Sequence, residues 1–179
     1  RYTLQVRAQV DSKLFSYEDL VDLGLAGWIR REATRGARIG YDPKLFSPDA
    51  LDRLKLAAAD AGAELVSVAT NPIDDAWGAQ RPPVPLTPAV PHAEKYAGES
   101  AASKRKRLGE IIAKDGADAA VITSPASIAW LFNMRGQDVA RSPLPLGSAI
   151  LNADGTADLF IAPEKTSADL KSWLGNQVA

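Results

Sequence analysis

The sequence has 179 residues, 46% of them hydrophobic, which is enough apolar material for one large domain or two small ones. Its 21 lysine and arginine residues balance 22 aspartate and glutamate residues, so no net basic charge is available to hold nucleic acid or an anionic membrane. There is no cysteine, which excludes disulfides, thiolate metal sites and cysteine nucleophiles. No apolar run approaches the roughly 18 residues of a membrane span. We expect a soluble protein, cytoplasmic by default, that binds neither nucleic acid nor membrane.

The start of the sequence predicts a strand, because apolar and polar side chains alternate through residues 2–10. Since the sequence opens directly on this pattern and without an initiator Met, we expect it to be part of a longer polypeptide.

The next sixty residues alternate helix and strand patterns. A short helical pattern in residues 19–31 precedes a brief strand at 38–42. Ser47 and Pro48 then cap and begin a helix, and residues 64–69 form the following strand. This order is typical of an α/β unit in which helices connect consecutive strands.

Residues 70–98 differ in composition, because six prolines interrupt any helical or ladder register. His92, the only histidine of the chain, lies here and is expected to be an exposed loop residue. We predict a linker over residues 81–98, between a first domain of residues 1–80 and a second of residues 99–179.

The sequence of the second domain predicts a further set of helices and strands. Ser100 can cap a helix with a basic run, residues 104–107, on its solvent face and with Leu108, Ile111 and Ile112 toward a core. The later elements follow in chain order: a strand at 119–123, a helix beginning at Ser124-Pro125, a hairpin of 144–152 with 157–161, and a helix at 167–174.

The sequence contains no complete catalytic constellation. The only histidine, His92, stands in the proline-rich loop, so we expect neither a metal site built from histidines nor a Ser-His-Asp arrangement with ordinary geometry. Asp74 and Asp75 are adjacent, so they are interpreted as the start of a helix rather than as a catalytic pair. No glycine-rich phosphate loop is present. We therefore expect this segment to perform no chemistry alone and to hold no metal or cofactor.

Four stretches resemble one family. Residues 128–139 (IAWLFNMRGQDV) resemble the I-A-W-L-x-N-x-R-G-x-D-[IV] stretch in the middle domain of Xaa-Pro aminopeptidases, also called aminopeptidase P. The start, RYTLQ, is similar to the tail of the D-G-R-Y-x-L-Q strand in the family's first domain. Residues 73–82 (IDDAWGAQRP) are similar to its [LI]-[IV]-D-x-[IVA]-W-x-x-R-P loop, and residues 96–100 (YAGES) to the Y-[AT]-G-x-S start of the second domain. The four stretches occur in the family's order.

The resemblance implies two α/β units of the creatinase/prolidase N-terminal type with mixed sheets. The first would be truncated at its N-terminus, and the completeness of the second stays open. The family's catalytic domain, of pita-bread fold, binds two divalent metals, usually manganese, through two Asp, one His and two Glu, and none of those positions lies in this sequence. The implied reaction is hydrolysis of the bond between an N-terminal residue and a following proline. The implied partners are that catalytic domain, a second copy in a homodimer and a proline-containing peptide; the noncatalytic domains shape substrate access and dimerisation.

The resemblance also implies candidate site residues. The arginine of D-G-R-Y is implicated in substrate binding in relatives, which carries over to Arg1, although the preceding Asp-Gly is absent here. Trp77 is expected to be a core residue, or else an exposed indole that caps a cleft.

Two interpretations of the polar stretch after residue 132 stay open. In the structural interpretation, residues 130–132 pack between helix and sheet, Gly136 permits a turn, and Arg135 pairs with Asp138. In the functional interpretation, Asn133, Arg135 and Asp138 face the catalytic domain and brace its substrate cleft.

A second class of function also stays open, since catalytically inactive aminopeptidase-like modules can bind peptides or histones. A creatinase or prolidase parent is a third possibility. The sequence downstream of Ala179 would distinguish them, because only a peptidase keeps the metal ligands.

Overall fold

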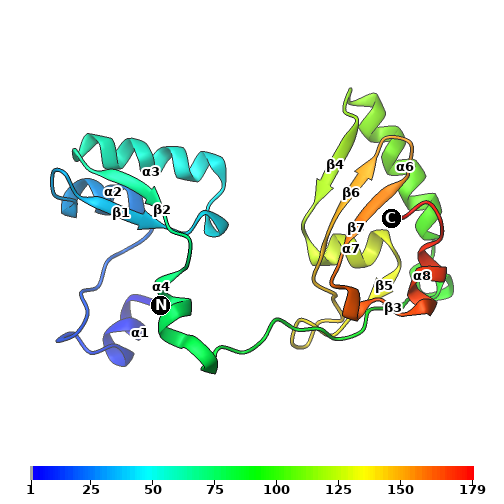
Figure 1. Cartoon of the computed structure of the whole chain (residues 1–179), viewed down its shortest axis with the longest axis horizontal. Helices are drawn as coiled ribbons and strands as arrows, with labels where there is room; N and C mark the ends of the chain where they lie inside the picture. The colour runs from blue at the N-terminus through cyan, green and yellow to red at the C-terminus, as the bar shows by residue number, and fades with distance from the viewer. Residues whose placement is uncertain (1) are drawn as a thin grey trace. The chain divides into compact units, whose positions relative to one another are not determined.

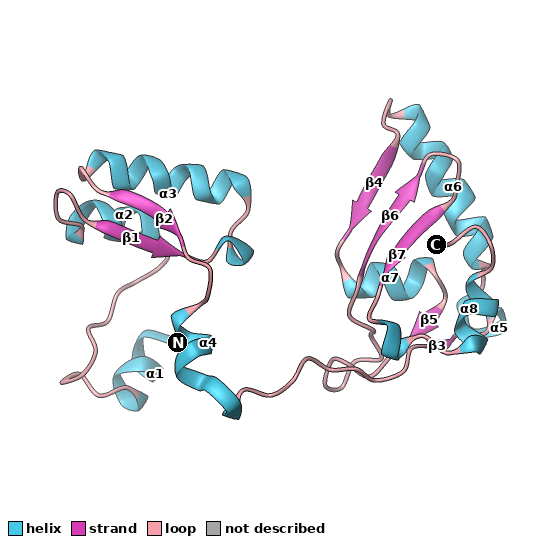
Figure 2. Ribbon diagram, in the orientation of Figure 1, coloured by secondary structure: helices cyan, strands magenta, loops and turns pink. Residues whose placement is uncertain are grey.

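The computed structural model describes residues 2–179, which divide into two compact units (Figure 1). Unit 1 runs to Pro82, and unit 2 runs from Pro83 to Ala179. Each unit combines helices with small sheets of its own, and within the described range no strand of one unit pairs with a strand of the other (Figure 2). The predicted α/β class is confirmed. No helix in residues 2–179 is long and apolar enough to cross a bilayer.

Unit 1 is built around one parallel pair of strands. β1 (Arg38–Tyr41) and β2 (Glu64–Ser67) lie side by side, and α3 (Pro48–Asp60) forms the crossover between them. A parallel pair needs such a crossover because the chain must return to the same end of the sheet. The strand, helix and strand predicted for residues 38–69 are therefore confirmed.

A small apolar core holds unit 1 together. α2 (Gly24–Glu32) packs against α3, and both cover the strand pair, so that Ile29, Leu54 and two alanines of α3 are buried. α2 is shorter than the predicted helix of residues 19–31, because the residues before Gly24 form turns with exposed side chains.

The prediction of a strand in residues 2–10 is wrong. These residues form α1 (Tyr2–Gln9), a helix in which no residue is buried. An alternating pattern produces a strand only where a neighbouring strand can pair with it, and β1 and β2 pair only with each other among the described residues. Without that partner, the backbone forms local helical hydrogen bonds.

Side-chain caps explain where several helices begin. In each case, the side chain before the first turn accepts a hydrogen bond from a backbone N–H two or three residues further on, which satisfies a group that has no partner within the helix. The capping residues are Ser47, Asn71, Ser100, Ser124 and Ser167.

The proline-rich segment is only partly a linker. α4 (Pro72–Trp77) precedes it, with Asp74 and Asp75 in its first turn as predicted. Beyond the exposed prolines, β3 (Val90–Pro91) pairs antiparallel with β5 (Met134–Arg135), and Ala89 is fully buried. The predicted linker of residues 81–98 therefore belongs to unit 2 from Pro83 on, and its second half is built into that unit by β3.

Unit 2 contains an antiparallel sheet of three strands in the order β4-β6-β7. The predicted hairpin is confirmed, and α6 and α7 pack against the sheet (Figure 1). The buried core includes Ile128, Phe132, Met134 and Leu170. The other helices and strands of unit 2 are α5 (Glu94–Ala97), α6 (Ala101–Lys114), β4 (Ala119–Ile122), α7 (Pro125–Leu131), β6 (Ser148–Asn152), β7 (Ala157–Phe160) and α8 (Ala168–Leu174). Short 3-10 turns cover Pro43–Leu45 and Gly78–Gln80 in unit 1 and Pro163–Lys165 in unit 2.

α6 presents a different face to the core than predicted. Lys104 and Arg105 are 1% and 3% exposed, so the expectation of a solvated basic run is wrong for these two residues. Ile111, expected in the core, is 48% exposed. Long basic side chains can cover apolar surface with their methylene stems while their charged ends reach polar partners, and both side chains do so here.

Gly109 allows the close approach of α6 to the turn between β6 and β7. A Cβ at this position would lie 2.7 Å from the Ala153 carbonyl oxygen and 2.9 Å from the Gly155 nitrogen. Gly109→Ala should therefore destabilise unit 2 by about 1–3 kcal/mol, although alanine favours a helix by about 1 kcal/mol over glycine. Urea unfolding followed by circular dichroism measures the change.

The matched control is Gly27→Ala, also inside a helix. Its Cβ would meet only the flexible side chain of Leu23, at 3.1 Å, so stability should stay equal or rise. Equal stability of the Gly109→Ala variant and the wild type would contradict the close approach.

Candidate functional site

The polar stretch of residues 133–138 follows α7 in unit 2. Leu131 and Phe132 are buried at 1% and 0% exposure, as the structural interpretation predicts, but Trp130 is 43% exposed and is not a core residue. Asn133 adopts φ +47°, a left-handed conformation that asparagine tolerates better than most residues. This residue turns the chain from α7 into β5.

Asn133 joins three segments of unit 2. It is 1% exposed, its Oδ1 accepts a hydrogen bond from Lys104 Nζ at 2.7 Å, and its Nδ2 donates to the Glu99 carbonyl at 2.8 Å. Its own carbonyl accepts from the His92 N–H at 2.7 Å. His92, predicted to be exposed, is partly buried here. The Asn133 side chain is therefore fully engaged within its own unit.

Lys104 is a buried cation held by neutral groups. Besides Asn133, its Nζ donates to the Trp130 carbonyl at 3.0 Å and lies 4.4 Å from the centroid of the Trp130 ring. Within residues 2–179, no carboxylate lies within ion-pair distance of it. Burial lowers the pKa of Lys104, and the nearby charge of Glu99 opposes that shift only in part. The indole face and the two oxygens replace the water that the ammonium loses.

Asp138 is the second buried polar centre. Its side chain has no exposed surface. One oxygen accepts hydrogen bonds from the Thr87 hydroxyl at 2.6 Å and the Thr87 N–H at 3.3 Å. The other accepts from Lys165 Nζ at 2.6 Å and the Leu146 N–H at 2.7 Å. A single carboxylate therefore connects four segments of unit 2.

The partners of Asp138 keep it ionised. Burial alone would raise the pKa of this carboxyl, but the hydrogen bonds from Lys165, Thr87 and Leu146 outweigh it and lower the pKa from 3.8 to about 2. Lys165 is almost as buried, with a side chain 3% exposed. Buried ion pairs of this kind are stable when the remaining lone pairs also have donors, as they do here.

Arg135 does not pair with Asp138, so that part of the structural interpretation is wrong. Its Nη1 donates to the carbonyls of Ala129 and Met134, at 3.2 and 2.9 Å, and the residue is partly exposed. Asp138 is instead occupied by Lys165, whose Nζ donates to it at 2.6 Å. Among the three candidate cleft residues Asn133, Arg135 and Asp138, Arg135 is the one whose side chain has accessible surface; Gln137, between them, is also exposed.

Gly136 is required for packing rather than for a turn conformation. A Cβ at Gly136 would lie 2.8 Å from the Cα of Pro145, so a larger residue would push apart the two segments that Asp138 connects.

The remaining sequence-predicted site residues lie in unit 1. Trp77, at the end of α4, is 49% exposed and is not a core residue. Beside it, Arg81 forms an exposed ion pair with Asp74 at 3.3 Å. Arg1 lies outside the described residues, so its predicted role in substrate binding stays a prediction.

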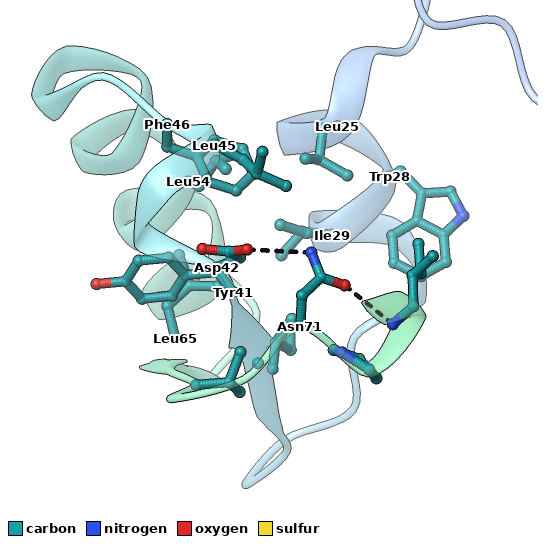
Figure 3. Close-up of a pocket in the computed structure, with 15 residues that line it drawn as sticks. Leu25, Trp28, Ile29, Tyr41, Asp42, Leu45, Phe46, Leu54, Leu65 and Asn71 are labelled. Carbon is teal, nitrogen blue, oxygen red and sulfur yellow. Dashed lines mark hydrogen bonds between the residues drawn. The ribbon is translucent and has the colours of Figure 1, made fainter. Parts of the chain in front are cut away.

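Unit 1 has an apolar pocket of about 300 Å³ between α2, β1 and the segment around Asn71 (Figure 3). Leu25, Trp28 and Ile29 line one side of it. Its polar groups satisfy one another, because Asn71 Nδ2 donates to Asp42 at 3.1 Å and Asn71 Oδ1 caps α4. The pocket therefore offers contact surface and no reactive group.

No metal centre can be assembled from the described residues. Within residues 2–179, no three His, Cys, Asp or Glu side chains lie close enough together to hold a metal ion. The donor set expected for two divalent metals does not fit this part of the chain.

Three members of these clusters, Lys104, Thr87 and Lys165, are not among the residues predicted from the sequence. The position of Lys104 four residues before Leu108 and eight before Ile112 could have placed it on the core face of α6. No local pattern marks Lys165, because its partner lies 27 residues away in the sequence.

Replacing Asp138 tests the importance of the carboxylate. Asp138→Asn should destabilise unit 2 by about 2–4 kcal/mol at neutral pH, because Lys165 would remain buried without an anion. Since the pKa of Asp138 is depressed, its contribution is fully present above about pH 4 and is lost as the pH falls through about 2. The difference between variant and wild type should therefore shrink on acidification. Urea unfolding at pH 7 and pH 3 measures it.

Asp118→Asn is the control for that experiment, since Asp118 is exposed and its carboxylate makes no hydrogen bond or ion pair in the described structure. It should unfold like the wild type at both pH values. A pH-independent loss of stability in Asp138→Asn would show that shape, and not charge, is responsible.

Comparison with known sequences identifies relatives over most of the chain. Residues 80–179 match the family described as "Creatinase/Prolidase N-terminal domain". Aminopeptidase P2 of Arabidopsis thaliana is 36% identical over 183 residues, which cover 98% of this chain and 25% of the relative. Xaa-Pro aminopeptidase 2 of Sus scrofa is 29% identical over 178 residues, covering 98% and 26%. The chain thus spans about a quarter of the length of the curated relatives that it matches.

A solved structure matches the fold as well. The crystal structure of X-prolyl aminopeptidase from Caenorhabditis elegans, described as a cytosolic enzyme with a di-nuclear active site, superposes with a TM-score of 0.86 and 27% identity. The match covers 99% of this chain and 29% of that one. The resemblance inferred from the four sequence stretches is confirmed: the chain belongs to the creatinase/prolidase N-terminal domain family, and its relatives are Xaa-Pro aminopeptidases.

Proposed function

We propose that this chain forms two noncatalytic units of an Xaa-Pro aminopeptidase, which hydrolyses the bond between an N-terminal residue and proline. The observation that carries the proposal is one of coverage: similarity extends over nearly the whole chain, but the chain covers only about a quarter of each relative. Residues 1–80 would be the C-terminal part of the first domain, and residues 99–179 would belong to the second.

The chemistry would then take place outside this chain. A pita-bread catalytic domain in the same polypeptide would hold two divalent metals, manganese in our proposal, since residues 2–179 offer no matching donors. The di-nuclear active site of the Caenorhabditis elegans enzyme supports the number of two metals. The contribution of this chain is to shape access to the substrate cleft.

The predicted cleft residues differ in exposure, which supports different roles for them. Arg135 and Trp77 have accessible surface and are the candidates for direct contact with the catalytic domain or the peptide. Asn133 and Asp138 are buried, so they would act by positioning the stretch that carries Arg135. The hydrogen bonds of Arg135 to two carbonyls already restrict its side chain.

The proposal includes a homodimer in the cytoplasm. Its support is the cytosolic location of the Caenorhabditis elegans relative and, for the dimer, the family resemblance. If the polypeptide lacks two Asp, one His and two Glu at the metal positions beyond Ala179, the chain instead belongs to an inactive peptide- or histone-binding module.

The 179-residue chain alone should bind no manganese tightly and cleave no Xaa-Pro peptide. The reason is the lack of a three-donor cluster in residues 2–179. Isothermal titration with Mn²⁺ and an assay with an Xaa-Pro-containing peptide measure both properties, with an intact aminopeptidase P as positive control. A two-site isotherm with micromolar affinity would refute this expectation.

We predict that Arg1 contacts the substrate. In the full-length enzyme, Arg1→Ala should lower kcat/KM for longer Xaa-Pro peptides, because a planar guanidinium can hold a peptide carbonyl or carboxylate away from the metals. Metal content and melting temperature should stay unchanged. Arg7→Ala, which changes a basic residue of the exposed helix α1, is the control. Identical kinetics of the Arg1→Ala variant and the wild type over several peptide lengths would remove Arg1 from the site.

A further inference from the structure

Unit 2 contains a small pocket at the first turn of α6 that the proposed function does not use. Its volume is about 190 Å³, and its lining includes Glu94, Ser100, Arg105, Trp173 and Leu174. Pockets for drug-sized ligands are typically about 300–1,000 Å³. This pocket therefore suits a single small metabolite.

Arg105 supplies a positive charge to the pocket. The residue is 3% exposed, and its Nε donates to the Gly155 carbonyl at 3.3 Å. Its two terminal nitrogens donate no hydrogen bond within residues 2–179, and no carboxylate in that range lies within 4.0 Å. Neither nitrogen is sealed from solvent, and Arg105 is one of the residues that line the pocket. A nearly buried guanidinium without an anion is an unfavourable arrangement that a bound anion would relieve.

The backbone adds donors beside this charge. Ala101 and Ala102 also line the pocket, and they occupy the first turn of α6, where N–H groups have no acceptor within the helix. Ser100 uses its hydroxyl oxygen to cap Ser103, so it leaves these two N–H groups free. The positive end of the helix dipole acts in the same direction as Arg105.

The rest of the lining selects among anions. Glu94 is exposed on α5 at the same pocket, and its carboxylate would repel a simple anion but attract an ammonium group. Trp173, which donates its indole N–H to the Phe132 carbonyl at 3.1 Å, has a fixed ring, and Leu174 extends the apolar wall. The pocket thus combines a carboxylate site, an ammonium site and an apolar wall.

We propose that this pocket binds a free α-amino acid with an apolar side chain. Its carboxylate would lie on Arg105 and the first turn of α6, its ammonium would face Glu94, and its side chain would pack against Trp173. This inference goes beyond the proposed peptidase function, because binding should occur in the 179-residue chain itself.

The first test compares ligands that each lack one recognised group. L-Leucine should bind the 179-residue chain with a dissociation constant of about 0.1–1 mM, as expected for so small a ligand. L-Leucinamide, which lacks the carboxylate, and N-acetyl-L-leucine, which lacks the ammonium, should bind at least about tenfold more weakly. Calorimetry measures affinity, and tryptophan fluorescence reports binding at Trp173, with Trp173→Phe removing that signal.

The second test uses matched variants. Arg105→Gln should weaken L-leucine binding at least about tenfold, whereas Arg107→Gln, the same change on the exposed face of α6, should not. Glu94→Gln should weaken the binding of L-leucine but not that of N-acetyl-L-leucine, which has no ammonium for Glu94 to attract and a carboxylate for it to repel. Because Glu94 is exposed, this variant keeps the proposal testable even if Arg105→Gln fails to fold.

Two results would overturn the proposal. One is the lack of any saturable change with L-leucine. The other is acetate binding as tightly as L-leucine with no effect of Glu94→Gln, which would define a simple anion site.

Discussion

The buried ion pair between Asp138 and Lys165 is the constraint on which the arrangement of unit 2 depends. Neither side chain has appreciable contact with water, and the same carboxylate also accepts hydrogen bonds from Thr87 and from the Leu146 N–H. The segments around residues 87, 138, 146 and 165 must therefore meet at one point. Separating this pair is costly, because removal of one partner leaves the other charged and without water. This is why a loop-rich region with few regular elements can have a defined shape.

A second polar centre fixes the other end of the same stretch. Asn133 and Lys104 connect the end of α7 to α6 and to the segment that follows β3. Between these two centres lies Arg135, which is restrained by two carbonyls and still has accessible surface. Asn133 and Asp138 in the motif of residues 128–139 thus hold the backbone, while Arg135, Gln137 and Trp130 keep accessible surface for a contact with another surface. That division agrees with a supporting role beside a catalytic domain.

The sequence predicted correctly those features that depend only on residues close together in the chain. Ser47, Ser100, Ser124 and Ser167 each cap a helix through a hydrogen bond to a residue three positions away, so the helix starts could be predicted without knowledge of the fold. The hairpin of β6 and β7 was equally predictable from its short turn. The alternating pattern of residues 2–10 failed, because a strand needs a partner that the pattern itself does not supply.

By itself, the sequence determined the α/β class, most helices and strands of both units, and the family. Only the tertiary structure decided which charged residues are buried and what they bind. The sequence pattern places Lys104 and Arg105 toward solvent, whereas both are buried, and the structural interpretation pairs Asp138 with Arg135, whereas its partner is Lys165. The physical reason is distance along the chain: Asp138 meets Lys165 across 27 residues and Thr87 across 51, and no local pattern records such contacts. Burial of a charge becomes favourable only after folding has brought its partners together.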